Sequence, residues 1–184
     1  HMGWAKVVTA GTMVIEGMPM SWRTKRALDG LNRGDVLRVG RTLYVGQGAR
    51  SNADGIAQLR ALLEEFGYRV QAVPTRDCLH LKSAATQVAD GTLLVQSDWI
   101  DTGVFTGLRL IEVDPDEAHA ANALRIGRGV LHPECFPRTR QRLHAAGITV
   151  TPIDISELQK AEGAVTCCSL LFEAQPAHGD VVAA

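Results

Sequence analysis

The sequence has no excess of charge of either sign and no long apolar run. Its 184 residues carry 19 Lys and Arg against 20 Asp and Glu, for a net charge of −1. A chain this neutral offers no basic field to a phosphate backbone, so nucleic acid is not an expected partner. The longest apolar stretch without charge, residues 163–172, is far shorter than the roughly 20 residues that cross a bilayer. A membrane-spanning role is therefore excluded. Since no charged segment followed by an apolar one opens the chain, we expect a cytoplasmic location.

Cysteines are also scarce, and their spacing excludes two common uses. The sequence contains Cys78, Cys135, Cys167 and Cys168. These are too few and too irregular for a secreted disulfide framework, and no CxxC pair indicates a structural zinc site. His132 lies near Glu134 and Cys135, but alternation along a strand would place these side chains on different faces. We therefore expect no metal.

Short β-branched and apolar runs alternate with a helical pattern, which indicates an α/β fold. Residues 42–45 and 92–95 are such runs and predict strands. Apolar side chains recur at helical spacing over residues 53–65 and predict a helix there. Ser51 is the expected cap at the start of this helix, and Gly67 is its expected left-handed stop.

The length and one repeated pattern indicate how the chain is organised. At about 150 residues per domain, we expect a single domain over residues 1–172, followed by a flexible tail at 173–184. A helix end, a glycine and a strand follow one another at Gly67 and again at Gly147, 80 residues later. Repetition on this scale predicts stacked copies of one strand–helix–strand unit. The alternative, that any α/β protein repeats this succession, stays open at this point.

His80 and Cys167 each interrupt an apolar segment that predicts a strand. A histidine or cysteine in such a place is often structural, since free cysteine behaves as a small hydrophobic residue. One cysteine and one distant histidine also form a candidate nucleophile and acid/base pair, which only the fold can bring together. On a strand, alternation lets only one of Cys167 and Cys168 share a face with His80.

The loop at residues 46–51 follows a predicted strand and opens a helix, as a dinucleotide-binding loop does. It contains Gly46 and Gly48, but Ser51 stands where the third glycine of that motif belongs. Arg50, at the tip of this loop, could instead hold a carboxylate by two parallel hydrogen bonds. A solvated surface arginine is the third interpretation.

Five longer segments point to a known family. They are residues Gly34–Gly46, Cys78–Ser83, Ile111–Pro115, Ala120–Leu124 and Leu158–Ser169. Together they resemble the dimethylargininases, a family of the guanidine-modifying superfamily that includes arginine deiminases and amidinotransferases. The resemblance runs from about residue 34 to residue 172.

The resemblance implies a propeller of five ββαβ units around a substrate channel, and hydrolysis of an N-methylated arginine to citrulline and a methylamine. It implies that Cys167 attacks the guanidinium carbon, and that His80 protonates the leaving amine and then activates water. Arg50 would bind the α-carboxylate, and backbone near Ala161 would border the same end of the substrate. The family needs no cofactor, so none is expected. The implied partner is a small guanidine.

The chain departs from the family pattern where the guanidinium should bind. Asn32 stands where the family has an acidic residue, and with Asp35 it is our candidate for that end of the substrate. Asp29 could substitute for the missing carboxylate, and Trp4 occupies the position of a second one. The segment between residues 23 and 34 is too short for the helix of a family unit. The implied fold is therefore an incomplete α/β propeller, without the first unit and with about four units or fewer.

These features predict a cysteine-dependent hydrolase of N-methylated arginine or of a related guanidine. The alternative is a truncated, catalytically impaired relative that acts as an oligomeric or partner-binding module. A missing unit would expose apolar strand edges and helix faces, which favours association, so we expect a homo-oligomer. A nucleotide-binding oxidoreductase, through the loop at residues 46–51, is the third possibility.

Overall fold

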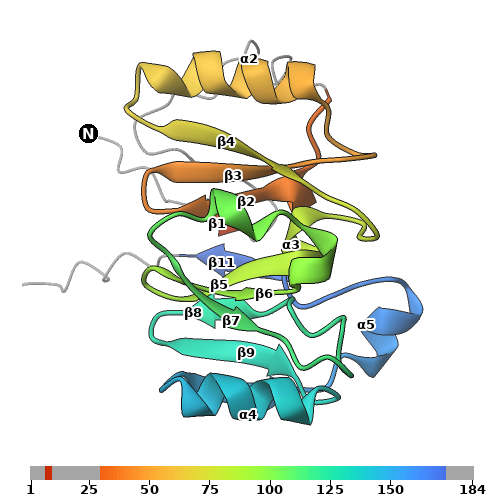
Figure 1. The fold of residues 1–184 in the computed structure, drawn as a ribbon. Coiled ribbons are helices and arrows are strands. Elements are labelled where there is room, and N and C mark those ends of the chain that lie inside the picture. Colours follow the sequence, from red (N-terminus) through yellow and green to blue (C-terminus); the bar gives the residue numbers. More distant parts are fainter. Residues whose placement is uncertain (1–6, 10–29, 173–184) are drawn as a thin grey trace, which may run out of the picture.

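The computed structural model describes residues 7–9 and 30–172, and in them three three-stranded sheets follow one another (Figure 1). In each sheet an antiparallel hairpin is followed by a third strand that runs parallel to the second. The strands are β2 (Val36–Val39), β3 (Thr42–Gln47) and β4 (Arg69–Pro74), then β5 (Ala85–Ala89), β6 (Thr92–Val95) and β7 (Arg109–Glu112), and finally β8 (Leu124–Ile126), β9 (Gly129–Pro133) and β10 (Thr149–Ile153). A fourth, two-stranded sheet pairs β1 (Val7–Thr9) with β11 (Leu170–Phe172). The predicted α/β class is confirmed.

The connections to the parallel strands show the succession expected from the sequence. Helix α2 (Ala53–Glu64) joins β3 to β4, and α4 (Pro137–Ala145) joins β9 to β10. Each helix is followed by a glycine with positive φ, 70° at Gly67 and 83° at Gly147, a conformation that glycine adopts without a steric penalty. In the middle sheet two 3₁₀ turns, η2 (Ser97–Trp99) and η3 (Thr102–Val104), take the place of the helix.

The start of α2 corrects one prediction. The expected cap, Ser51, is wrong by one residue, because the side chain of Asn52 accepts a hydrogen bond from the Gly55 N–H at 2.8 Å. Ser51 is only 2% exposed. Its hydroxyl donates instead to the carboxylate of Asp35 at 2.7 Å. Ser51 does not cap the helix because its hydroxyl is hydrogen-bonded to Asp35, which is 16 residues away in sequence.

Helices α2 and α4 lie on opposite sides of the structure, with the middle sheet between them (Figure 1). Helix α2 buries Ile56, Leu59 and Leu63 against the first sheet. Helix α4 buries Leu143 against the third. Full burial of one such side chain contributes about 1.5–3 kcal/mol, so each helix is held mainly by its apolar face.

The first strands of the three sheets contact one another in succession. Strand β2 contacts β5, and β5 contacts β8. This succession is what strands around a shared axis would show, and the propeller-like arrangement of units stays our prediction. The predictions on Trp4, Asp29 and the tail at 173–184 lie outside the described residues.

Three short helices complete the described elements near the candidate site residues: η1 (Arg33–Asp35) directly precedes β2, α3 (Leu81–Ala84) directly precedes β5, and α5 (Ser156–Lys160) follows β10. Helix α3 contacts η1, β2 and β5, which places it between the first two sheets. Within residues 7–9 and 30–172, no helix is both long and apolar enough to cross a bilayer. The cytoplasmic location stays a prediction.

Candidate active site

His80 lies in a bend directly before α3, not on the strand that the sequence pattern predicted. Its ring packs against the backbone of Gly34, where an added Cβ would lie 2.5 Å from His80 Cγ. Its Nε2 is buried and has no hydrogen-bond partner among the described residues. Burial lowers the pKa of His80, and the nearby charge of Asp35 offsets part of this effect. The imidazole is therefore neutral near pH 7 and able to accept a proton.

Asp35 is the buried carboxylate that holds this region together. It is 3% exposed. Its Oδ1 accepts a hydrogen bond from the Leu81 N–H at 2.9 Å, and its Oδ2 accepts one from the Ser51 hydroxyl at 2.7 Å. Leu81 directly follows His80, and Ser51 directly follows Arg50. One carboxylate thus fixes the segments that carry the candidate acid/base group and the candidate substrate-binding arginine.

Asn32 is tied to the same group of contacts. Its backbone N–H donates to the Ser51 hydroxyl oxygen at 2.9 Å, and its side-chain oxygen accepts from the Gly34 N–H at 2.9 Å. The amide therefore caps η1, and it brings no negative charge to the site.

The glycines of the 46–51 loop have a packing explanation. A Cβ on Gly46 would lie 2.9 Å from Asp35 Oδ1, and a Cβ on Gly48 would lie 2.3 Å from Thr75 Oγ1. Both glycines are thus required by close side-chain neighbours. A buried carboxylate beside this loop disfavours a bound phosphate, which argues against the dinucleotide interpretation.

Cys167 lies in a turn over residues 165–168, so the predicted strand is wrong here, and strand alternation cannot choose between the two cysteines. The Ala164 N–H donates to its sulfur at 3.0 Å, and the thiol is 3.2 Å from the Ala164 carbonyl. Both Cys167 and Cys168 are exposed, with their sulfurs 3.7 Å apart. Burial, and then the interaction with Cys167, raise the pKa of Cys168, which lowers the fraction of Cys168 present as the reactive thiolate.

Lys82 and Asn122 connect the cysteine turn to the histidine segment, and the sequence analysis gave neither a role. Burial lowers the pKa of Lys82 to about 8, while the charges of Asp35 and Cys167 act in the opposite direction. Lys82 is therefore in electrostatic range of both groups. The Asn122 side chain is hydrogen-bonded to the Lys82 carbonyl and to Thr166. The signals were present, as a lysine two residues after His80 and an amide within an alanine-rich run.

The six predicted site residues are not all joined directly. The hydrogen bonds of Asp35 to Leu81 and Ser51, and of Asn32 to Ser51, connect the segments that carry His80, Arg50, Asn32 and Asp35. The charge of Arg50 lowers the pKa of His80. In the described part of the chain, Cys167 and His80 are not hydrogen-bonded to each other, and Lys82 provides the link between their segments. That they share one pocket stays a prediction.

Ala161 follows α5 in an exposed turn, where its N–H donates to the Leu158 carbonyl. The next residue, Glu162, has a φ of 56°, and Asp77 in the loop before His80 has a φ of 52°. Left-handed backbone is unfavourable for residues with a side chain and clusters at functional sites. Both of these residues lie in loops that carry candidate site residues.

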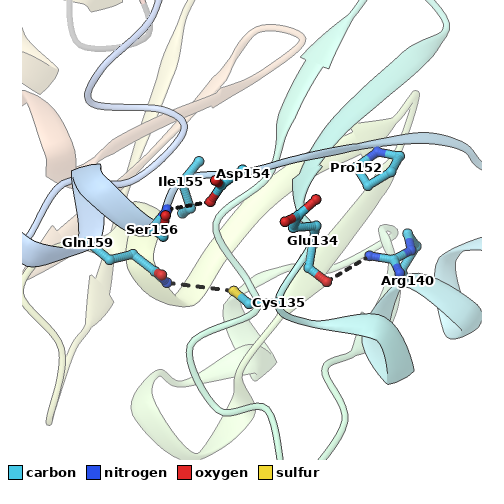
Figure 2. A pocket seen from close by; sticks show the side chains of 8 residues that line it. All are labelled: Glu134, Cys135, Arg140, Pro152, Asp154, Ile155, Ser156 and Gln159. Carbon is cyan, nitrogen blue, oxygen red and sulfur yellow. Dashed lines mark hydrogen bonds between the residues drawn. The ribbon is translucent and has the colours of Figure 1, made fainter.

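A surface pocket of about 450 Å³ lies elsewhere, between the end of the third sheet and α5 (Figure 2). Its lining residues are Glu134, Cys135, Arg140, Pro152, Asp154, Ile155, Ser156 and Gln159. Inside it, the Gln159 amide approaches Cys135 Sγ at 3.8 Å, and the Arg140 guanidinium donates to the Glu134 carbonyl (Figure 2). None of the six candidate residues lines it. The part of the chain that the structure describes also has no group of three His, Cys, Asp or Glu side chains placed to bind a metal.

Comparison with known proteins shows that the chain is similar in sequence to two bacterial proteins that share one name. The chain is 34% identical over 139 residues to N(G),N(G)-dimethylarginine dimethylaminohydrolase of Pseudomonas aeruginosa, which covers 76% of this chain and 55% of that protein. It is 43% identical over 141 residues to the Streptomyces coelicolor protein of the same name, over 76% of this chain and 54% of that protein. No protein-family model matches.

A solved structure agrees with these sequence similarities. The crystal structure of a dimethylarginine dimethylaminohydrolase adduct with S-methyl-L-thiocitrulline superposes with a TM-score of 0.70 at 32% identity, covering 77% of this chain and 56% of that one. The fold and the sequence together define a member of the guanidine-modifying pentein superfamily. Within that superfamily the chain is a dimethylargininase-like protein. It spans about half the length of the curated relatives it matches.

Proposed function

We propose that the chain carries the nucleophile and the acid/base group of a hydrolase that acts on N-methylated arginine or a related guanidine. The observation that supports this most is the pair of buried polar bridges, at Asp35 and Asn122, between the segments of Arg50, His80 and Cys167. Buried polar groups are costly unless each is paired. Two paired bridges that end on neighbouring residues of α3, Leu81 and Lys82, favour a preorganised site over ordinary core packing.

In the first half of the proposed reaction, Cys167 is the nucleophile. Neutral His80 takes up the proton as the thiol ionises, and the thiolate sulfur forms a bond to the guanidinium carbon. The bond from this carbon to the methylated nitrogen then breaks, and His80 delivers its proton to the departing amine. The product of this half is a thiouronium on Cys167 and free dimethylamine.

In the second half, His80 is again neutral and removes a proton from water. The water oxygen bonds to the thiouronium carbon, and the carbon–sulfur bond breaks. His80 returns the first water proton to the Cys167 sulfur, and the second water proton is released to solvent, where it protonates the freed dimethylamine. Citrulline leaves, and the chain regains its starting state. The lowered pKa of His80 suits both halves, since a base has to be unprotonated at the working pH.

The substrate-binding residues have distinct proposed roles. Arg50 is exposed on its loop and can hold the α-carboxylate with two parallel hydrogen bonds. Backbone at Ala161 borders the same end. Asp35 acts on the guanidinium through its charge, because both of its oxygens already accept hydrogen bonds from the protein. Asn32 offers a neutral contact where the family has a carboxylate.

The test is release of citrulline from asymmetric dimethylarginine by the purified chain. We expect turnover in the wild type, loss of turnover in Cys167→Ala, and retention in the matched variant Cys168→Ala. Wild-type release no greater than that of Cys167→Ala would refute the hydrolase proposal.

The amide at Asn32 supports the second candidate function. Its oxygen caps the Gly34 N–H, and a guanidinium in a dry site without a charged partner is destabilised by about 3–5 kcal/mol. A relative impaired in this way could act as an oligomeric or partner-binding module, with a homo-oligomer as the expected state. Light scattering on the purified chain tests this, and a monomer at micromolar concentration would contradict it.

A further inference from the structure

Asn122 is buried between two segments that are far from it in sequence. It lies in the connection between β7 and β8 and is 7% exposed. Its Nδ2 donates to the Lys82 carbonyl at 2.8 Å and to Thr166 Oγ1 at 2.9 Å, and its Oδ1 accepts from the Thr166 N–H at 3.1 Å. Its partners are 40 and 44 residues away. One amide thus joins the helix after His80 to the residue before Cys167.

The backbone that carries Asn122 is itself fixed. Thr86 Oγ1 donates to the Ala121 carbonyl at 2.6 Å and accepts from the Ala123 N–H at 3.2 Å. Both alanines are buried. The amide therefore projects from an anchored support, and its three hydrogen bonds transmit that position to Lys82 and Thr166.

We propose that Asn122 is the positioning residue of the Cys167 nucleophile, which it serves by fixing the backbone of Lys82 against the turn that carries the sulfur. This inference rests on the proposed function, because it assigns Asn122 to the same site. The thiolate is the reactive form of cysteine, and a nearby ammonium and backbone N–H groups favour it. In the described structure these are Lys82 and the Ala164 N–H.

The experiment measures the rate of alkylation of each cysteine by iodoacetamide as a function of pH, by peptide mass spectrometry. Cys167 is already exposed, so changes in its rate report the state of the sulfur more than its access. Cys135, which is also exposed, is the internal reference. In Asn122→Ala we expect the Cys167 midpoint to move to higher pH, and its rate at pH 7 to fall by about tenfold relative to Cys135, the scale of one lost contact to an ionised group.

Two further variants keep the test decisive. Thr166→Val removes one of the three hydrogen bonds and keeps the shape of the side chain, so it should shift the midpoint in the same direction by less. Thr139→Val is the matched control, since the Thr139 hydroxyl is fully buried and accepts from the Asp114 N–H at 3.0 Å, away from the cysteine turn. If Asn122→Ala fails to fold, Thr166→Val decides.

A double-mutant cycle with Lys82→Gln separates positioning from general loosening. If Asn122 acts through Lys82, the effect of Asn122→Ala should largely disappear in the Lys82→Gln background. A folded Asn122→Ala with an unchanged midpoint, or an effect that is fully additive with Lys82→Gln, would overturn the proposal. A midpoint shift without any citrulline release by the wild type would support it while the hydrolase proposal fails.

Discussion

Removal of the Asp35 carboxylate is the perturbation whose consequences the structure defines most fully. The side chain is 3% exposed and accepts from the Leu81 N–H at 2.9 Å and from the Ser51 hydroxyl at 2.7 Å. Asp35→Ala deletes both bonds and leaves two buried donors unpaired. Asp35→Asn keeps the size and an oxygen for Leu81, but removes the charge and the acceptor that Ser51 uses.

The size of the effect follows from these contacts. Each hydrogen bond to a charged group contributes about 1.5–3 kcal/mol. Asp35→Ala should therefore lower the free energy of unfolding by about 3–6 kcal/mol, a large part of the 5–15 kcal/mol typical of a domain. Asp35→Asn loses one such bond, so a decrease of about 1.5–3 kcal/mol is expected. For a chain of this length, 1 kcal/mol corresponds to about 2–4 °C in Tm.

Electrostatics give a second readout with a defined sign. The charge of Asp35 raises the pKa of His80 and that of Arg50 lowers it. Asp35→Asn should therefore move the His80 pKa down, and Arg50→Gln should move it up. The imidazole resonance of His80, followed by NMR against pH, measures both.

Asp54→Asn is the control for the stability measurement, because Asp54 is an exposed acidic residue in the first turn of α2. A Tm for Asp35→Ala equal to that of Asp54→Asn would refute the stabilising role. A His80 pKa that moved in the same direction in Asp35→Asn and Arg50→Gln would refute the electrostatic reasoning.

Three further predictions concern packing and pH. Gly34→Ala places a Cβ 2.5 Å from His80 Cγ and should lower the free energy of unfolding by about 1–3 kcal/mol. In the control Gly129→Ala the nearest atom to the added Cβ would lie at 3.8 Å, so the free energy of unfolding should change little. Urea denaturation of both variants checks this. Burial lowers the pKa of His132 below its usual 6.5, so on acidification the unfolded chain binds a proton at this imidazole before the folded chain does. The free energy of unfolding should therefore fall as the pH drops below about 6.5. Denaturation at several pH values should show a smaller fall in His132→Gln. Leu59→Ala empties a fully buried site under α2 and should lower stability by about 2–5 kcal/mol, and a decrease below 1 kcal/mol in denaturant unfolding would contradict this.

Local patterns predicted the regular elements well. The helix expected over residues 53–65 is observed at Ala53–Glu64, and the strand expected at residues 92–95 is observed at Thr92–Val95. Both depend on near neighbours, through apolar periodicity and stop signals. Gly67 and Gly147 were identified on the same basis.

The surroundings of the candidate site could not be predicted in this way. The segments of His80 and Cys167 have strand-like composition, but the structure places the first residue in a bend and the second in a turn. Both are held by long-range polar contacts, through Asp35 to Leu81 and through Asn122 to Thr166, over 46 and 44 residues. Periodicity contains no information at that separation. Ser51 shows the same effect, because the local pattern predicted a helix cap, whereas its hydroxyl donates a hydrogen bond to the distant Asp35.

The turn at Gly127 between β8 and β9 separates, along the chain, the histidine segment of the candidate site from the cysteine turn. Gly127 has a φ of 59°, and no atom lies within 4 Å of where its Cβ would be. A backbone cut there would leave His80 and the two buried side chains that anchor the site, Asp35 and Asn122, on one polypeptide, and Cys167 on the other. Two such halves, produced separately, would form a complementation pair whose reassociation could be followed at the sulfur.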